Sequence, residues 1–171
     1  MKIHSIFFLF VFYLTGCDNP FAPRLDSSPP NSTSILADQH QLEGVFHNFK
    51  QAYAFQDSTI YGEVLAPNFI FTYPDYNNHG IDVFWGRDEE IRTTYGLFQN
   101  VQRLDLVWNS IKVSSIDSDS LKATITRNFN LTVTFSANDI VRINGDATWT
   151  LERLQTSENW KITRWRDVSN Y

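Results

Sequence analysis

The fold of this chain is decided by the run Leu121-Lys122-Ala123-Thr124-Ile125-Thr126-Arg127-Asn128-Phe129-Asn130-Leu131-Thr132-Val133-Thr134-Phe135. Odd-numbered positions are apolar and even-numbered positions are polar, with one break at Arg127. A period of two is typical of a long β-strand with one buried face and one solvated face. An unpaired guanidinium in the middle of the buried face would be costly, so Arg127 needs a carboxylate, a bound anion or a water-filled hollow. We therefore expect a sheet that curls around a pocket, with Arg127 inside the pocket.

Length, composition and charge limit the class of protein. The 171 residues are enough for one domain with a hydrophobic core. Aromatic residues make up 15% of the chain, which favours β-structure and a bulky interior or pocket wall. The net charge is −5 and no basic run occurs. Because phosphate neutralisation needs clustered Lys and Arg, we do not expect a nucleic acid as a partner.

Residues 1–16 have the pattern of a signal peptide. A short basic start precedes nine apolar residues, Ile6 to Leu14, which are too few to span a bilayer. The run ends in Leu14-Thr15-Gly16-Cys17, which resembles the lipobox of bacterial lipoproteins and contains the only Cys of the chain. The resemblance implies that Cys17 is acylated and anchors the protein to membrane lipid in the bacterial cell envelope, at the inner or the outer membrane. The alternative is a buried Cys after an ordinary signal peptide.

A tether is predicted between the anchor and the folded domain. Residues 17–34 include four Pro and four Ser and few hydrophobic residues. This composition is typical of a flexible linker. We therefore divide the chain into a signal peptide (1–16), a lipidated Cys with its tether (17–34) and one folded domain (35–171).

The folded domain reads as helices followed by strands. Apolar residues recur at three and four positions in 35–56, which predicts an amphipathic helix with Asp38 or Ser34 as N-cap. A second, shorter helix begins at Asp57 and is stopped by Pro67. Short strands over 69–73 and 81–85 precede a helix over 86–99 with Ile91, Tyr95 and Phe98 on its inner face. Four long strands follow, over 103–116, 121–135, 140–154 and 160–168.

The predicted class is α+β. Strands joined by short turns imply one curved antiparallel sheet of about six strands, wrapped around three helices on its N-terminal side as a cone-shaped, cystatin-like roll. The first long strand changes phase between Trp108 and Ile111, which predicts a β-bulge that bends it.

This arrangement resembles the nuclear transport factor 2-like superfamily, in its SnoaL-like branch. Three local features carry the resemblance: the helix end Tyr53-Ala54-Phe55-Gln56-Asp57, the helix entry Trp85-Gly86-Arg87-Asp88-Glu89-Glu90-Ile91, and the closing strand Trp160-Lys161-Ile162-Thr163-Arg164-Trp165-Arg166-Asp167. The superfamily includes isomerases, dehydratases, epoxide hydrolases and cyclases, as well as binding and assembly domains without catalytic activity. Membership of the fold therefore does not settle the function.

Two charged residues are the candidate catalytic groups. Arg127 resembles the pocket arginine of the limonene epoxide hydrolases, and it could hold a carboxylate or another anion. Asp167 resembles the aspartate of their closing strand, which acts as a base. Those enzymes have Arg-x-Asp on the neighbouring strand, whereas Phe129 stands at that position here and argues against epoxide hydrolysis. The alternative is an Asp167–Arg127 salt bridge without a substrate.

Aromatic residues supply the remaining candidate ligand contacts. We expect Tyr53, Tyr73 and Trp108 to line the pocket together with Arg127 and Asp167. No set of His, Asp and Glu has the spacing of a metal site, so neither a metal nor another cofactor is predicted.

Three functions agree with these patterns. We rank a membrane-anchored domain that binds a small apolar or anionic ligand first, because the chain lacks a complete set of acid and base residues. The enzymatic alternative is a cofactor-free lyase, isomerase or hydrolase that uses Asp167 with Arg127. The third is a non-catalytic assembly domain, a homodimer formed through the Thr-rich outer face of the sheet.

Overall fold

The computed structural model describes residues 35–170. The signal peptide, Cys17 and the tether lie outside the described residues. The elements of the domain follow in chain order: α1 (Leu42–Phe55), α2 (Ser58–Val64), β1 (Leu65–Asp75), the 3-10 turn η1 (Tyr76–Asn78), β2 (Ile81–Gly86), α3 (Arg87–Asn100), β3 (Arg103–Ile116), β4 (Lys122–Ser136), β5 (Asp139–Glu152) and β6 (Lys161–Asn170). Within the described residues, no helix is long and apolar enough to cross a bilayer.

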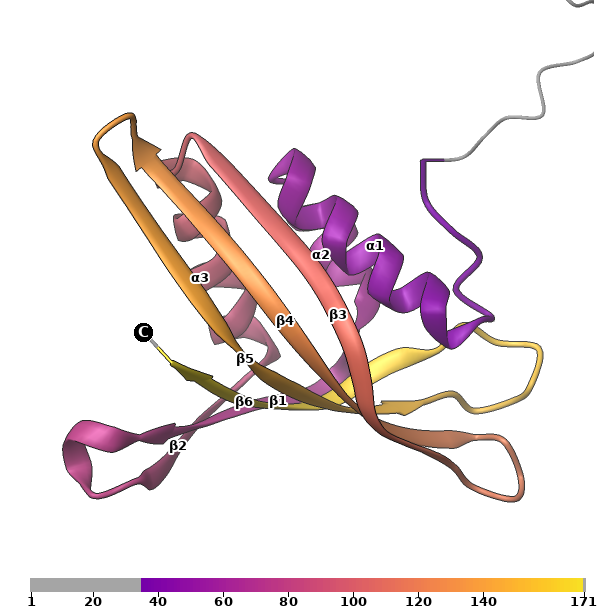
Figure 1. Ribbon diagram of the computed structural model, residues 1–171. Coiled ribbons are helices and arrows are strands. Elements are labelled where there is room, and N and C mark those ends of the chain that lie inside the picture. The colour runs from indigo at the N-terminus through magenta and orange to yellow at the C-terminus, as the bar shows by residue number, and fades with distance from the viewer. Residues whose placement is uncertain (1–34, 171) are drawn as a thin grey trace, which may run out of the picture. The chain divides into compact units, whose positions relative to one another are not determined.

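One curved sheet carries the three helices on its concave side (Figure 1). The strand order is β2-β1-β6-β5-β4-β3, and every neighbouring pair is antiparallel except β1 and β6, which run parallel. The predicted α+β class, with six strands and three helices, is confirmed, but the sheet is mixed and not antiparallel throughout. The parallel pair arises because α3 and the long strands separate β1 and β6 in the sequence, so that no hairpin joins them.

Irregular pairing at several places accompanies the curvature of the sheet. The register between β3 and β4 shifts between Trp108 and Ile111, where the phase change in the sequence predicts a bulge, and again before Val113. Further shifts occur in the pairing of β1 with β6 and of β5 with β6. Because bulges bend and twist a strand, they help to make the sheet concave enough to hold the helices.

The first helix begins later than the sequence pattern predicts. It starts at Leu42, and its N-cap Gln41 makes no side-chain hydrogen bond to the helix. The predicted cap Asp38 instead bonds His40, at 2.6 Å between Oδ1 and Nδ1. The buried Asn48 binds the backbone of Ala37 through both its oxygen and its nitrogen, which holds the preceding segment in a non-helical path along α1.

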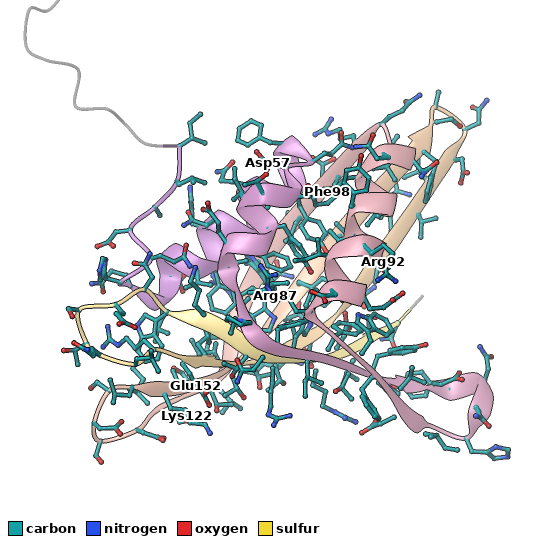
Figure 2. The ribbon with its side chains drawn as sticks, turned by 180° about the vertical axis from the view of Figure 1, so that it is seen from behind. Asp57, Arg87, Arg92, Phe98, Lys122 and Glu152 are labelled. Carbon is teal, nitrogen blue, oxygen red and sulfur yellow. The ribbon has the colours of Figure 1, made fainter. Side chains whose placement is uncertain are left out.

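Aromatic side chains join α1 to the sheet. Phe46 stacks on Trp149 of β5 at 4.3 Å between ring centroids, and Phe49 packs on the same indole at 4.9 Å. Phe49 also meets the edge of Trp165 on β6 at 5.3 Å. Such pairs add to the stabilisation from apolar burial, and they fix α1 over the middle of the concave face. Figure 2 shows the side chains that fill the space between the helices and the sheet.

The buried face of α3 differs from the expected one. Its buried residues are Glu90, Thr94 and Phe98, which recur every four positions. Phe98 faces inward as predicted. Tyr95 is 52% exposed, so the prediction that Tyr95 faces inward is wrong. The helix is rotated about its axis relative to the predicted orientation, so that Glu90 faces the interior and Tyr95 faces solvent.

Candidate functional site

Two adjoining hollows lie between the helices and the concave face. The inner hollow, of about 120 Å³, has apolar walls from α1 and strands β3 to β6, with Asp167 and Ser169 as its polar members. The outer hollow, of about 360 Å³, lies between α3 and strands β1, β2 and β6. Tyr53, Trp165 and Asp167 line both hollows, so these residues form the boundary where the hollows meet.

Asp167 is the central polar residue of this boundary. The alternation of β6 places it on the same face as Trp165, toward the helices. Its Oδ1 is withdrawn from solvent and has no hydrogen-bond partner within the described part of the chain. Burial raises the pKa of Asp167 to about 6, and the nearby negative charge of Glu90 adds to this, while a hydrogen bond from Ser169 opposes it. A carboxyl group of this kind can exchange a proton near neutral pH.

Glu90 is a second buried carboxylate, which the sequence analysis missed. It is only 5% exposed and it lines the outer hollow. Its Oε1 accepts hydrogen bonds from the hydroxyls of Tyr61 and Thr94, and its Oε2 accepts one from Trp85 Nε1 at 2.6 Å. In the sequence it reads as one of three acidic residues that favour the helix N-terminus. The four-residue spacing of Glu90, Thr94 and Phe98 is the signal that could have identified it.

The three predicted aromatic contacts all lie at the hollows. Tyr53 lines both, Tyr73 lines the outer hollow, and Trp108 lines the inner hollow. Burial, with the negative charges of Glu90 and Asp167, raises the pKa of Tyr53, so its hydroxyl stays protonated at neutral pH. Trp108 donates from Nε1 to the carbonyl of Phe46 at 3.1 Å, so its polar atom is already used.

Arg127 is paired with a carboxylate, one of the three possibilities raised by the sequence, but the carboxylate is that of Glu43 and not that of Asp167. Arg127 lies on the concave side as predicted, but its Nη1 binds both carboxylate oxygens of Glu43 on α1, at 2.8 and 3.0 Å. Its Nε donates to the carbonyl of Asn109 at 3.0 Å, and its guanidinium lies 5.0 Å from the centre of the Phe46 ring. Arg127 is not among the residues that line either hollow.

The prediction of a salt bridge between Asp167 and Arg127 is therefore wrong. The strand register gives the reason, because Ala147 of β5 is the direct partner of both residues and keeps them two strands apart. The guanidinium is neutralised from the helix side, which a strand pattern alone cannot reveal.

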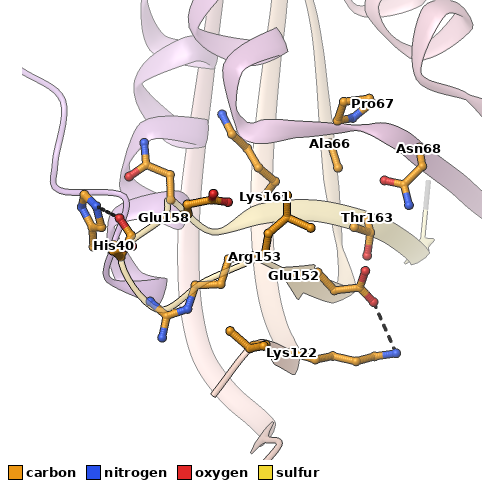
Figure 3. Close-up of a pocket in the computed structure, with 14 residues that line it drawn as sticks. His40, Ala66, Pro67, Asn68, Lys122, Glu152, Arg153, Glu158, Lys161 and Thr163 are labelled. Atoms are coloured by element: carbon orange, nitrogen blue, oxygen red, sulfur yellow. Dashed lines mark hydrogen bonds and ion pairs between the residues drawn. The ribbon is translucent and has the colours of Figure 1, made fainter. Parts of the chain in front are cut away.

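The two hollows together are called the chamber, and a larger groove lies outside it (Figure 3). It measures about 870 Å³, and the connection from β5 to β6, the start of β1 and the start of β4 surround it. Its charged side chains are partly paired with one another, as in the 3.3 Å contact between Lys122 and Glu152. Figure 2 shows these two residues at the end of the sheet opposite to Phe98. Because the residues that line the groove include no buried polar side-chain atom without a partner, whereas Asp167 and Trp165 at the hollows each have one, we place the candidate site in the chamber.

Comparison with solved structures identifies the fold. No protein-family model matches the sequence, and no curated protein aligns with it. Solved structures do match, among them a conserved protein from Planctomyces limnophilus, at 15% identity and a TM-score of 0.63 over 75% of this chain and 92% of that one. A candidate dehydratase of the NTF2-like family from Streptomyces avermitilis matches at 16% identity and a TM-score of 0.59, over 74% and 92%. The chain has the nuclear transport factor 2-like fold.

A third solved structure also has this fold. A candidate scytalone dehydratase from Novosphingobium aromaticivorans has 11% identity and a TM-score of 0.63, over 75% of this chain and 81% of that one. At these identities the likeness concerns the nuclear transport factor 2-like fold alone, so the chemistry must come from the site.

The chamber offers acid–base and binding chemistry. It combines a carboxyl group with a free oxygen, a second carboxylate held by three donors, and aromatic walls. Among the described residues, no group of His, Cys, Asp and Glu is arranged to hold a metal ion.

The raised pKa of Asp167 predicts a pH dependence of stability. An acid whose pKa is higher in the folded state than in the unfolded state binds more protons when folded, so its contribution to stability grows as pH falls. With a folded pKa of about 6 against 3.8 for the unfolded group, the change falls mainly between pH 7 and pH 4. Relative to Asp167→Asn, the unmodified domain should gain about 1 kcal/mol in unfolding free energy between pH 7 and pH 5.

Urea unfolding of both proteins at the two pH values measures this difference. Asp139→Asn, which removes one exposed carboxylate at the β4–β5 turn, is the matched control and should follow the unmodified protein. An equal pH response of Asp167→Asn and the unmodified domain would contradict the assignment.

Proposed function

We propose that this domain binds a small, largely apolar molecule in the chamber formed by the two hollows. The observation that carries the proposal is Asp167, whose buried Oδ1 has no partner at the place where the hollows meet. Leaving a buried acceptor unsatisfied costs about 1–3 kcal/mol. A ligand that donates a hydrogen bond to this oxygen would recover that cost.

The size and the walls of the chamber support this reading. A cavity of ~150 Å³ with apolar walls can hold benzene, and the inner hollow is only slightly smaller at about 120 Å³. The outer hollow is larger and carries the polar groups of Tyr73, Glu90 and Thr94. Apolar walls with a few convergent polar groups are the usual form of a small-ligand site.

Binding can be tested with the neutral fluorophore N-phenyl-1-naphthylamine. We expect saturable binding to the purified domain with one site per chain and increased emission. Ile143→Trp, which places a larger side chain in the inner hollow, should weaken the binding at least about tenfold, the equivalent of ~1.4 kcal/mol. Arg127→Met should leave the affinity unchanged, because Arg127 is held by Glu43 outside the hollows. Equal binding by Ile143→Trp and the unmodified domain would argue against the chamber.

Proton transfer is a second candidate function. The specific observation is again Asp167, because its raised pKa of about 6 suits a general base near neutral pH. In this reading Asp167 removes a proton from a bound hydroxyl or activated C–H group, as the first step of an elimination or isomerisation. Two of the structures with the same fold have names of candidate dehydratases, which agrees with this class of reaction. Arg127 has no part in this proposal, because Glu43 neutralises it at a distance from Asp167.

Deuterium exchange separates the enzyme from a binding protein. Native mass spectrometry of the purified domain first identifies any retained ligand. If Asp167 is a base, that ligand should gain deuterium from D2O with the unmodified domain and much more slowly with Asp167→Asn. Retention of the ligand without exchange in either protein would leave binding as the function and exclude proton transfer.

The proposed location is the cell envelope, with lipid on Cys17. Support comes from the sequence alone: the nine-residue apolar run and the lipobox-like Leu14-Thr15-Gly16-Cys17. In a bacterial host we expect the full chain to incorporate a labelled fatty acid and to sediment with membranes. Cys17→Ser should lose the label and move to the soluble fraction, since stable anchoring needs two acyl chains or an equivalent signal. Labelling of the Cys17→Ser protein would refute the anchor.

A further inference from the structure

The outer hollow is lined by a cluster of aromatic rings. Phe71 stacks on Trp85 at 4.6 Å and meets the edge of Trp165 at 4.9 Å, and Tyr73 meets Trp85 at 5.6 Å. With Tyr53, five aromatic side chains from α1, β1, β2 and β6 line this one hollow. Phe71 and Trp85 each cover one face of the other. An uncovered aromatic face carries partial negative charge, so the faces of this aromatic cage that stay open to the hollow attract cations.

The charged residues that line the hollows are all acidic. Glu90 and Asp167 both line the outer hollow, whereas no Lys, Arg or His is among the described residues that line either hollow. Glu90 is 5% exposed, and the donors around it are the neutral groups of Tyr61, Trp85 and Thr94. Glu90 is buried and Asp167 has one buried oxygen, and a cation bound in the outer hollow would offset the cost of withdrawing these carboxylate oxygens from water.

A second observation indicates that the site is incomplete without a ligand. Two buried polar atoms on the same face of β6, Asp167 Oδ1 and Trp165 Nε1, have no partner within the described chain. Trp165 is 7% exposed and lines both hollows. Most buried polar groups in proteins have a partner, and a ligand at this boundary could supply one. Asp167 Oδ1 is an acceptor that an ammonium group would satisfy, whereas Trp165 Nε1 is a donor that would need an acceptor atom elsewhere on the ligand.

We propose that the outer hollow binds an organic ammonium ion, held by the aromatic faces and by the charges of Asp167 and Glu90, with the apolar remainder of the molecule in the inner hollow. This inference rests on the proposed binding function and specifies the charge of the ligand. It replaces the anionic ligand expected from Arg127, because Glu43 already neutralises that guanidinium.

An isosteric pair of probes tests the charge directly. Benzyltrimethylammonium is a permanent cation, and 2,2-dimethylpropylbenzene has the same shape without the charge. Titration at pH 7.5, followed by tryptophan fluorescence and calorimetry, should show binding of the cation at least about tenfold tighter than binding of the neutral probe.

Each outcome of this titration has a definite meaning. Equal or tighter binding of the neutral probe would overturn the cation site while the proposed binding function stands. Failure of both probes, and of N-phenyl-1-naphthylamine, to bind would overturn the cation site and the binding function together.

Variants locate the cation within the chamber. Asp167→Asn and Glu90→Gln should each weaken the binding of benzyltrimethylammonium about tenfold and leave the neutral probe nearly unaffected. Trp85→Leu removes one wall of the cage and should weaken the cation to a similar degree. Glu89→Gln is the matched control, because Glu89 lies on the same helix and pairs with the exposed Arg92. An equal loss in Glu89→Gln would mean that only long-range charge matters, and would overturn the site.

The affinity for the cation should also depend on pH. The ionisable groups that face Asp167 are Glu90 from α3, Tyr53 from α1 and, at the outer hollow, Tyr73 from β1. Of these, Tyr53 stays neutral because its pKa is raised. Since a bound cation favours ionised Asp167, the affinity should rise with pH through about 6 in the unmodified protein but not in Asp167→Asn. A flat profile in the unmodified protein would remove Asp167 from the site.

Discussion

A carboxylate withdrawn from water without a cation beside it is the constraint on which this site depends. Asp167 is held there because β6 lies in the middle of a curved sheet and turns this residue toward the helices. Aromatic packing on Trp149 and Trp165 fixes α1 over this part of the sheet. The curvature that makes room for the chamber and the burial that perturbs Asp167 therefore have one structural origin.

The two carboxylates of the chamber have different hydrogen-bonding environments, although both line the outer hollow. Glu90 accepts hydrogen bonds from three neutral donors, which fix the position of its carboxylate. Asp167 keeps one oxygen free. When two acidic groups lie in different environments, they can have different roles in the same site. In this chamber the oxygens of Glu90 are occupied by protein donors, and Asp167 is the group available to a ligand or a proton.

The order of the elements and the α+β class could be predicted from the sequence, because periods of two and of 3.6 residues are local signals. The bulge after Trp108 was also visible, as a change of phase within one strand. The start of α1 was placed too early, since the hydrogen bonds of Asn48 that hold the preceding segment join residues eleven positions apart. Local periodicity does not report such contacts.

The site was predictable only in part, for the same reason. The pattern of β6 and the resemblance of its closing residues identified Asp167, and the aromatic candidates Tyr53, Tyr73 and Trp108 all lie at the hollows. The pairing of Arg127 with Glu43 and the burial of Glu90 depend on how the helices rotate over the sheet. The inner face of α3 carries Glu90 and Thr94 instead of the predicted Tyr95. Because Arg127 is paired with Glu43 and Glu90 lines the outer hollow, the expected ligand changes from an anion to a cation.

The most direct test of the central claim is the pKa of Asp167 itself. A ¹³C NMR titration of the side-chain carboxyl carbon in the ligand-free domain, assigned with Asp167→Asn, measures it. This account predicts a value near 6, well above the 3.8 of an ordinary aspartate. A value at or below 3.8 would show that the carboxylate is solvated or paired, and would contradict the account of the chamber.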